Sequence, residues 1–187
     1  MKYLISRRLF FKQQMIMRKF YIIFAILIAN IFYAQTELVR WNQANLAPTL
    51  SASNISASNA NSGFGIASRN WSESFFEISS IPLSTSIDNS KYLQFSVTPN
   101  SNYQITVSSF NFTYRAQSSG QKFEVRYSTN SDFSNPQTLT AATTTDTNWH
   151  SLSLSNFTNP IISSGKTIYI RFYIFNGSYN TFHISNG

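Results

Sequence analysis

The chain has 187 residues, which indicates one domain or at most two small ones, and its lack of cysteine excludes a disulfide framework, a thiolate zinc site and a cysteine nucleophile. The first 19 residues hold six basic and no acidic side chains, whereas the residues after Ala34 hold eight basic and all seven acidic ones, so +6 of the formal charge of +7 lies in the N-terminal segment. The nearly neutral body lacks the clustered cations that a phosphate backbone requires, and we expect no nucleic-acid partner.

Residues 1–35 have the layout of an export leader. A basic pair precedes an apolar run at residues 20–29, and the small residue Ala34 stands before a polar one. This order predicts a signal peptide that is cleaved after Ala34. A single membrane anchor is the alternative, but Asn30 interrupts an apolar stretch that is shorter than the roughly 20 residues a membrane span needs. We therefore expect a secreted or cell-surface protein that meets the membrane only through its signal peptide.

The start of the leader is unusually long for a signal peptide. Met17 lies directly before the basic pair, so we expect translation to begin at Met17 rather than at Met1. The alternative is an extended basic region at residues 1–16.

Residues 36–187 read as a single all-β domain. No stretch after Gln35 has helical spacing, whereas apolar and polar residues alternate in several short segments separated by Ser, Asn and Gly. The predicted strands lie at residues 93–97, 103–107, 110–114, 123–127, 152–154, 168–175 and 182–184. Many short strands with frequent turns predict a two-sheet antiparallel β-sandwich or jelly roll.

Two segments of this domain break the simple pattern. The alternation changes phase at Ser108-Ser109, which predicts a bulge or a bend between two strands. The Ser- and Asn-rich stretch 51–63 is low in complexity, and both a loop and a weak edge strand are consistent with it.

The order of these strand patterns carries a resemblance to a known class of module. Its motifs are Trp41, Tyr92-Leu93-Gln94-Phe95, Phe123-Glu124-Val125-Arg126-Tyr127-Ser128, Ile168-Tyr169-Ile170-Arg171-Phe172-Tyr173 and Thr181-Phe182-His183-Ile184-Ser185-Asn186. Over residues 38–187 the chain resembles β-sandwich modules of secreted and surface proteins of Bacteroidota, which often precede other domains in proteins exported by the type IX secretion system. Such modules are similar in outline to carbohydrate-binding jelly rolls, so the resemblance implies export and a carbohydrate partner.

The chain departs from these modules at its C-terminus. It stops at Gly187, within the expected closing strand, and it has Ser185-Asn186 where the relatives usually have Asp-Asn. A domain truncated at its C-terminus and a short free-standing version of the module are both consistent with this departure.

Aromatic residues are the candidates for a binding function. Trp71 follows Arg69 and Asn70 outside any clean alternation, as an aromatic residue in a polar loop would. Sugar rings stack their apolar C–H faces on exposed aromatic planes while polar neighbours bind the hydroxyls, so these three residues form a candidate glycan site. Trp41 and Trp149 are more consistent with core residues.

A second candidate surface lies on the strongest predicted strand. Tyr169, Arg171 and Tyr173 share its outer face, and Asn111 and Arg115 share the outer face of another strand. If these strands are neighbours, the two faces form a tyrosine–arginine patch able to hold a glycan. The competing interpretation is that the tyrosines pave one sheet with cation–π neighbours.

The search for catalytic residues gives no positive prediction. Glu73 and Glu77 are spaced so that they could share one strand face, as glycoside hydrolysis requires of two carboxyl groups, but solvated acids near an edge are the favoured interpretation. No Gly-x-Ser-x-Gly sequence accompanies His150 or His183, and neither histidine has a metal-ligand set around it in sequence. We therefore do not expect an enzyme.

Calcium is the only metal for which the loops offer candidate ligands. Asp88 and Asp132 lie in Asn- and Ser-rich loops, and carboxylate and carbonyl oxygens suit this ion. Turn formation by these residues is the favoured interpretation, so we expect no cofactor, with a structural calcium as the alternative. The sequence as a whole predicts a secreted, non-catalytic module that binds polysaccharide or cell-surface glycan; the alternative is a structural or adhesive surface domain without a small ligand.

Overall fold

The structure, a computed structural model, describes residues 37–42, 47–50, 52–72, 75–81, 83–158, 160–178 and 181–185, with the side chains of residues 68–72 left out. The leader at residues 1–35, with its predicted signal peptide, lies outside this part of the chain. The described residues belong to one compact unit, Glu37–Gly187. Within them, no helix is long and apolar enough to cross a membrane.

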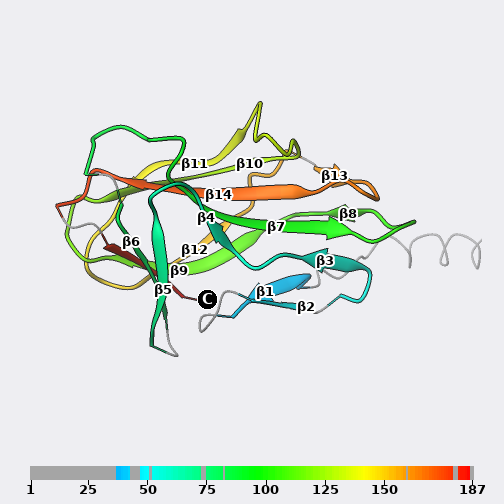
Figure 1. The fold of residues 1–187 in the computed structure, drawn as a ribbon, viewed down its shortest axis with the longest axis horizontal. Helices are drawn as coiled ribbons and strands as arrows, with labels where there is room; N and C mark the ends of the chain where they lie inside the picture. Colours follow the sequence, from blue (N-terminus) through cyan, green and yellow to red (C-terminus); the bar gives the residue numbers. More distant parts are fainter. Residues whose placement is uncertain are drawn as a thin grey trace, which may run out of the picture. The chain divides into compact units, whose positions relative to one another are not determined.

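Fifteen strands make up the described chain (Figure 1). They are β1 (Val39–Trp41), β2 (Pro48–Leu50), β3 (Ile55–Ala57), β4 (Asn61–Ser62), β5 (Ala67–Ser72), β6 (Phe75–Ser79), β7 (Leu93–Pro99), β8 (Ile105–Thr106), β9 (Phe110–Ala116), β10 (Lys122–Ser128), β11 (Gln137–Thr144), β12 (His150–Leu154), β13 (Ile161–Ile162), β14 (Ile168–Phe175) and β15 (Thr181–Ser185).

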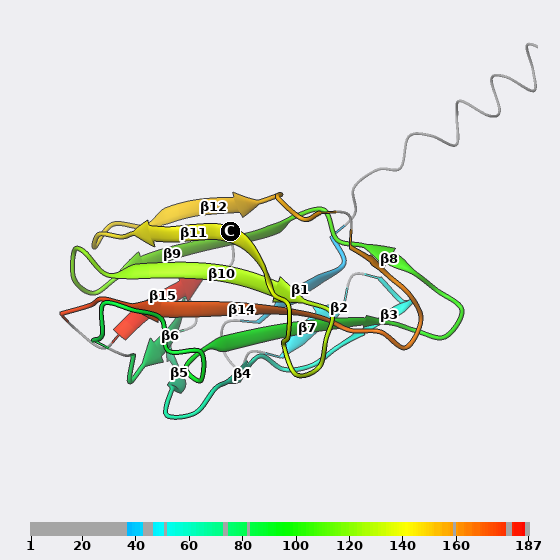
Figure 2. The same ribbon diagram turned by 90° about the horizontal axis from the view of Figure 1, so that it is seen from above.

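Two large antiparallel sheets contain most of these strands. The first, here called the β14 sheet, has the order β11-β10-β14-β7-β3, with β4 also pairing with β7. The second, the β15 sheet, has the order β12-β9-β15-β6-β5. Figure 2 shows β10, β14 and β7 running side by side in the β14 sheet. The predicted all-β, two-sheet antiparallel sandwich is therefore confirmed.

Phenylalanine rings join the two sheets. Phe112 of β9 meets Phe172 of β14 with 4.8 Å between ring centroids, and Phe123 of β10 meets Phe182 of β15 at 5.8 Å. Phe123, Phe172 and Phe182 are at most 1% exposed. Burial of such side chains stabilises the fold by roughly 1.5–3 kcal/mol each. The alternation read from the sequence therefore places one face of each central strand in this core. The other face of each strand belongs to the outer face of its sheet.

The strand predictions were accurate where alternation is long and less so elsewhere. The predicted phase change is confirmed, since β8 ends at Thr106 and β9 begins at Phe110. The stretch 51–63 holds two short strands, β3 and β4, beside β7, in agreement with the weak-strand interpretation. Strands β1, β2, β5, β6, β11 and β13 were not predicted; β11, for example, consists mostly of Thr and Ala, and only Leu139 in it is buried.

Candidate functional site

The outer face of the β15 sheet carries a row of polar residues at its centre. Glu77 of β6 is the cross-strand partner of His183 of β15, and His183 is in turn the partner of Arg115 of β9. Their neighbours Phe182 and Ile184 fill the core, so alternation turns His183 to the opposite face. The pairing of three strands thus brings together an acid, an imidazole and a guanidinium from positions far apart in sequence.

Hydrogen bonds connect this row and define its proton positions. Arg115 donates from Nε to His183 Nδ1 at 2.9 Å. Because a guanidinium can only donate, Nδ1 accepts, and the ring proton of His183 lies on Nε2, which faces Glu77 Oε2 at 3.4 Å. Burial lowers the pKa of His183, and the charge of Arg115 acts in the same direction, whereas the hydrogen bond with Glu77 raises it. His183 is therefore a neutral link between a cation and an acid.

Glu77 corrects one of the sequence-based interpretations. It was taken as a solvated acid near a sheet edge, but only 3% of the residue is exposed, and β6 lies one strand inside the edge strand β5. The interpretation failed because β5 was not predicted, and so the edge was misplaced. Glu73, its proposed companion, lies outside the described residues.

Two aromatic rings surround the Arg115 guanidinium. Its central carbon lies 4.9 Å from the centroid of the Trp149 ring and 5.4 Å from that of Phe75, and the two rings are 5.8 Å apart. Trp149 is 43% exposed, so its assignment to the core was wrong, whereas Trp41 is buried as expected. Trp149 precedes β12, whose inward-facing leucines begin only at Leu152. Arg115 and the two rings together form a stacked aromatic–cation cluster at the surface.

A carboxylate fixes the turn that presents Trp149. Oδ1 of Asp146 accepts hydrogen bonds from the backbone N–H of Asn148 at 2.8 Å and from Nε2 of His150 at 2.7 Å. The hydrogen bond from His150 is the main reason that the pKa of Asp146 lies below its ordinary value. Trp149 lies between these two residues in sequence, so one carboxylate ties the backbone before Trp149 and the side chain after it.

Arg115 and the two aromatic rings beside it line a hollow on the surface of the β15 sheet. Its volume is about 510 Å³, within the range typical of small-molecule sites. The lining, which we call the Arg115 hollow, consists of Phe75, Thr113, Arg115, Trp149 and Ser185. Two aromatic planes, one guanidinium and two hydroxyl groups therefore converge on one space. Phe75, Thr113 and Ser185 were not singled out from the sequence, although the parity of Arg115 and His183 along their strands places Thr113 and Ser185 on the same face.

The predicted residues Arg69, Asn70 and Trp71 lie on β5, the edge strand of this sheet. Arg69 is the cross-strand partner of Glu77 and Asn70 that of Phe76, and the register shifts between Asn70 and Ser72. Trp71 is therefore a strand residue at an irregularity, not a loop residue as its sequence context indicated. The side chains of these three residues lie outside what the structure describes.

The outer face of the β14 sheet holds the second group of predicted residues. The Arg171 guanidinium lies 3.7 Å from the Tyr92 ring centroid and 4.0 Å from that of Phe133, and its Nε donates to Gln94 Oε1 at 2.7 Å. Tyr173 is only 2% exposed, and this burial raises its pKa. Its ring is covered rather than presented to a ligand. We call this surface the Arg171 face.

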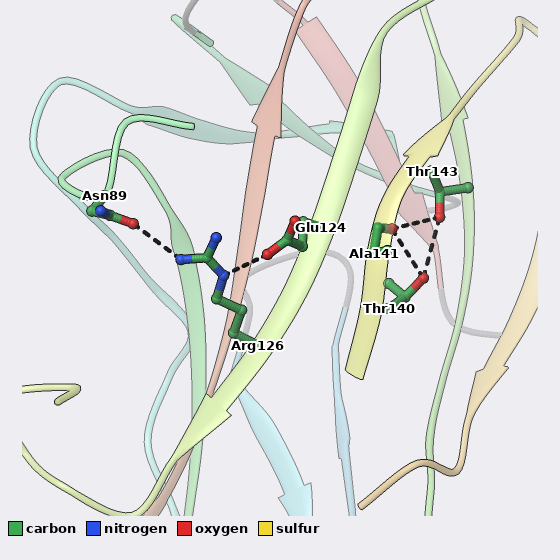
Figure 3. A network of polar contacts seen from close by, with 6 residues as sticks. All are labelled: Asn89, Glu124, Arg126, Thr140, Ala141 and Thr143. Carbon is green, nitrogen blue, oxygen red and sulfur yellow. Dashed lines mark hydrogen bonds and ion pairs between the residues drawn. The ribbon is translucent and has the colours of Figure 1, made fainter. Parts of the chain in front are cut away.

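A second arginine on the Arg171 face also contacts both polar partners and an aromatic ring. Arg126 donates from Nε to Glu124 Oε1 at 2.5 Å and from Nη1 to Asn89 Oδ1 at 3.2 Å, as Figure 3 shows, and its guanidinium lies 5.0 Å from the Tyr173 ring centroid. On the neighbouring β11, the hydroxyls of Thr140 and Thr143 bond to the carbonyl of Ala141 and to each other.

The predicted joint patch of tyrosines with Asn111 and Arg115 is not formed. The neighbours of β14 are β10 and β7, whereas Asn111 and Arg115 lie on β9 in the other sheet. Alternation gives the face of a strand but not its neighbours, and so the sequence could not decide this point. Tyr169 lines a separate polar hollow of about 500 Å³, together with Asp132 and Lys166.

The two candidate calcium ligands close turns. Oδ1 of Asp88 accepts hydrogen bonds from N and Oγ of Ser90 at 2.9 and 2.6 Å, and Oδ1 of Asp132 accepts one from N of Ser134 at 2.9 Å. These serine bonds lower the pKa of both carboxyl groups. Within the described residues, no three acidic or histidine side chains gather in a way that could hold a metal ion. The expectation of no cofactor, with a structural calcium as the alternative, stays a prediction.

Comparison with known proteins gives matches among solved structures alone. No family model and no curated protein matches the chain. A variant of the carbohydrate-binding module CBM29-2, in complex with mannohexaose, is similar with a TM-score of 0.42 and 14% identity over 82% of this chain and 94% of that module. A family 11 carbohydrate-binding module from Clostridium thermocellum, in complex with a mixed-linked tetrasaccharide, has a TM-score of 0.40 and 9% identity over 73% of this chain and 88% of that one. The bound saccharides are ligands of those two modules and are not assigned to this chain.

Proposed function

We propose that this protein is a non-catalytic module that binds polysaccharide or cell-surface glycan through the Arg115 hollow. The observation that carries the proposal is Trp149, a large aromatic residue that is 43% exposed beside a guanidinium and two hydroxyl-bearing residues. A sugar ring offers apolar C–H faces and a rim of hydroxyl groups. A hollow with aromatic walls and polar corners matches both kinds of surface.

The composition of the hollow supports binding rather than turnover. Its five lining residues include no carboxyl group and no imidazole. General acid–base chemistry needs such a group within hydrogen-bond reach of the substrate. The acid–imidazole pair that adjoins the Arg115 guanidinium, Glu77 and His183, is buried and joined by a hydrogen bond. We propose the same non-catalytic role for the protein as a whole.

Export and the predicted residues of β5 complete the proposal. The leader pattern supports secretion, and secretion would bring the hollow into contact with extracellular glycans. Because β5 pairs with β6, we propose that Arg69, Asn70 and Trp71 extend the binding surface beyond Phe75. Tyr169 and Arg171, on the other sheet, are proposed as a secondary contact surface beside the second hollow.

Substitution of Trp149 tests this function. The purified chain would be run through native gels that contain individual polysaccharides, and binding would be quantified by titration calorimetry. We expect Trp149→Ala to weaken binding by roughly five- to tenfold, because a stacked ring contributes on the order of 1–1.5 kcal/mol. The matched control is Tyr103→Ala, which removes a ring that is 52% exposed and does not line the hollow.

The alternative function predicts a different result. A structural or adhesive surface domain would fold normally and bind no polysaccharide in any gel. Retained binding in Trp149→Ala, or equal loss in Tyr103→Ala, would contradict the Arg115 hollow as the site.

A further inference from the structure

Arg115 is a cation whose charge is not matched by any carboxylate that the structure describes. Its Nε donates to a neutral imidazole, and its guanidinium lies against two aromatic rings. Within the described residues, no acidic side chain forms an ion pair with Arg115, whereas Arg40 and Arg126 are paired with Glu37 and Glu124. A half-buried guanidinium without an anion keeps its full capacity to bind one.

The surroundings of Arg115 hold the guanidinium in one orientation. The hydrogen bond to His183 fixes the Nε edge, and the rings of Phe75 and Trp149 limit rotation of the plane. Arg115 lines the hollow, and within the described part of the chain its two Nη groups donate no hydrogen bond. A guanidinium held in this way loses little conformational entropy when it binds an anion.

We propose that the Arg115 hollow binds a saccharide that carries a carboxylate, namely a uronic acid residue of an acidic glycan. This inference rests on the proposed glycan-binding function and names its ligand class. The two coplanar oxygens of a carboxylate match the parallel N–H groups of a guanidinium in a bidentate pair. The ring of the same sugar then lies over the exposed face of Trp149. A neutral sugar would use the rings and the hydroxyls but would leave the cation unmatched.

One polysaccharide in two charge states tests the inference. The full chain is titrated with polygalacturonate and with the same polymer after methyl esterification of its carboxyl groups, which removes the charge and keeps the sugar rings. We expect the acid form to bind at least about tenfold more tightly, because a charge-assisted bidentate pair exceeds a neutral hydrogen bond by this much. Added salt should reduce the preference, because mobile ions screen the pair.

Variants locate the preference at one guanidinium. In Arg115→Gln, the acid and ester forms should bind equally, whereas Arg115→Lys should keep part of the preference, since it keeps the charge but loses the planar fork. The control is Arg126→Gln, which removes a partly exposed arginine with similar aromatic contact on the other sheet and should keep the full preference.

Each outcome has a definite meaning. Equal binding of acid and ester by the unchanged chain would overturn the inference and leave the proposed function intact. No binding of either form, or of any neutral polysaccharide, would overturn both. Tighter binding of sulfated than of carboxylated polymers would overturn the carboxylate assignment, and equal binding of polyglutamate would overturn the saccharide assignment.

Discussion

Both outer faces of the sandwich have arginines that contact aromatic rings, but the surroundings of these arginines differ. On the Arg171 face, two arginines contact aromatic rings and each also bonds to a polar partner: Arg171 to Gln94, and Arg126 to Glu124 and Asn89. In the Arg115 hollow, the guanidinium also contacts rings, and its one hydrogen bond to the described part of the chain goes to a neutral histidine. Aromatic–arginine contact alone therefore does not mark a binding site. What sets Arg115 apart is that it lines a hollow with two aromatic rings, whereas Arg171 and Arg126 line neither of the two hollows described above.

Removal of Arg171 should give the largest change in stability on these surfaces. We expect Arg171→Ala to lower the free energy of unfolding by roughly 2 kcal/mol, since two cation–π contacts and a hydrogen bond from a charged donor are lost. Urea denaturation measures this change.

A surface arginine serves as the control for Arg171. The Arg40 side chain is 56% exposed and forms an ion pair with Glu37 three residues away. Arg40→Ala should leave the midpoint of urea denaturation nearly unchanged, because an exposed ion pair contributes little to stability. A comparable loss in both variants would mean that the contacts with Tyr92 and Phe133 contribute nothing specific.

Stability should depend on pH through His183. Its pKa in the folded protein lies below the ordinary histidine value of 6.5, chiefly because the residue is buried. As the pH falls below 6.5, the unfolded chain takes up a proton that the folded chain does not, so stability decreases until the pH reaches the folded pKa and then levels off. Above neutrality this group adds no pH dependence.

Thermal unfolding between pH 8 and pH 5 measures this effect. Tm of the unchanged chain should fall over the lower part of the range, and His183→Gln should show a flatter profile because the titrating group is gone. Parallel profiles for the two proteins would show that His183 is not responsible. The same variant would show whether the Arg115 hollow needs the imidazole to hold its guanidinium.

The sequence predicted the faces of the strands better than their arrangement. Alternation in β7, β10 and β14 identified the core side chains, and the parity of His183 with Phe182 placed the histidine outside the core. The fold class followed from these patterns, because alternation and turns are local properties. Strand order was out of reach, because pairing joins residues far apart in sequence and alternation does not encode it.

The candidate site shows the same division. Arg115 was noticed for its outward face but was assigned to the wrong neighbours, and Trp149 was assigned to the core. Glu77 was read as solvated because its position opposite His183 arises only when β6 pairs with β15. Each of these errors concerns a contact between residues far apart in sequence, which local patterns do not predict.

The smallest effect that we expect is that of calcium on the thermal stability of the loops beside the Arg171 face. Asn89, which bonds to Arg126, follows Asp88, and Phe133, which contacts Arg171, follows Asp132. Each aspartate already accepts a backbone N–H two residues further along, so we expect these turns to hold without a metal. EDTA or millimolar Ca²⁺ should leave Tm unchanged, since only an ion that binds the folded state stabilises it. A rise in Tm with Ca²⁺ that Asp88→Asn or Asp132→Asn abolishes would instead establish a structural calcium. In that case, the cover of the Arg171 face would depend on an ion as well as on its own hydrogen bonds.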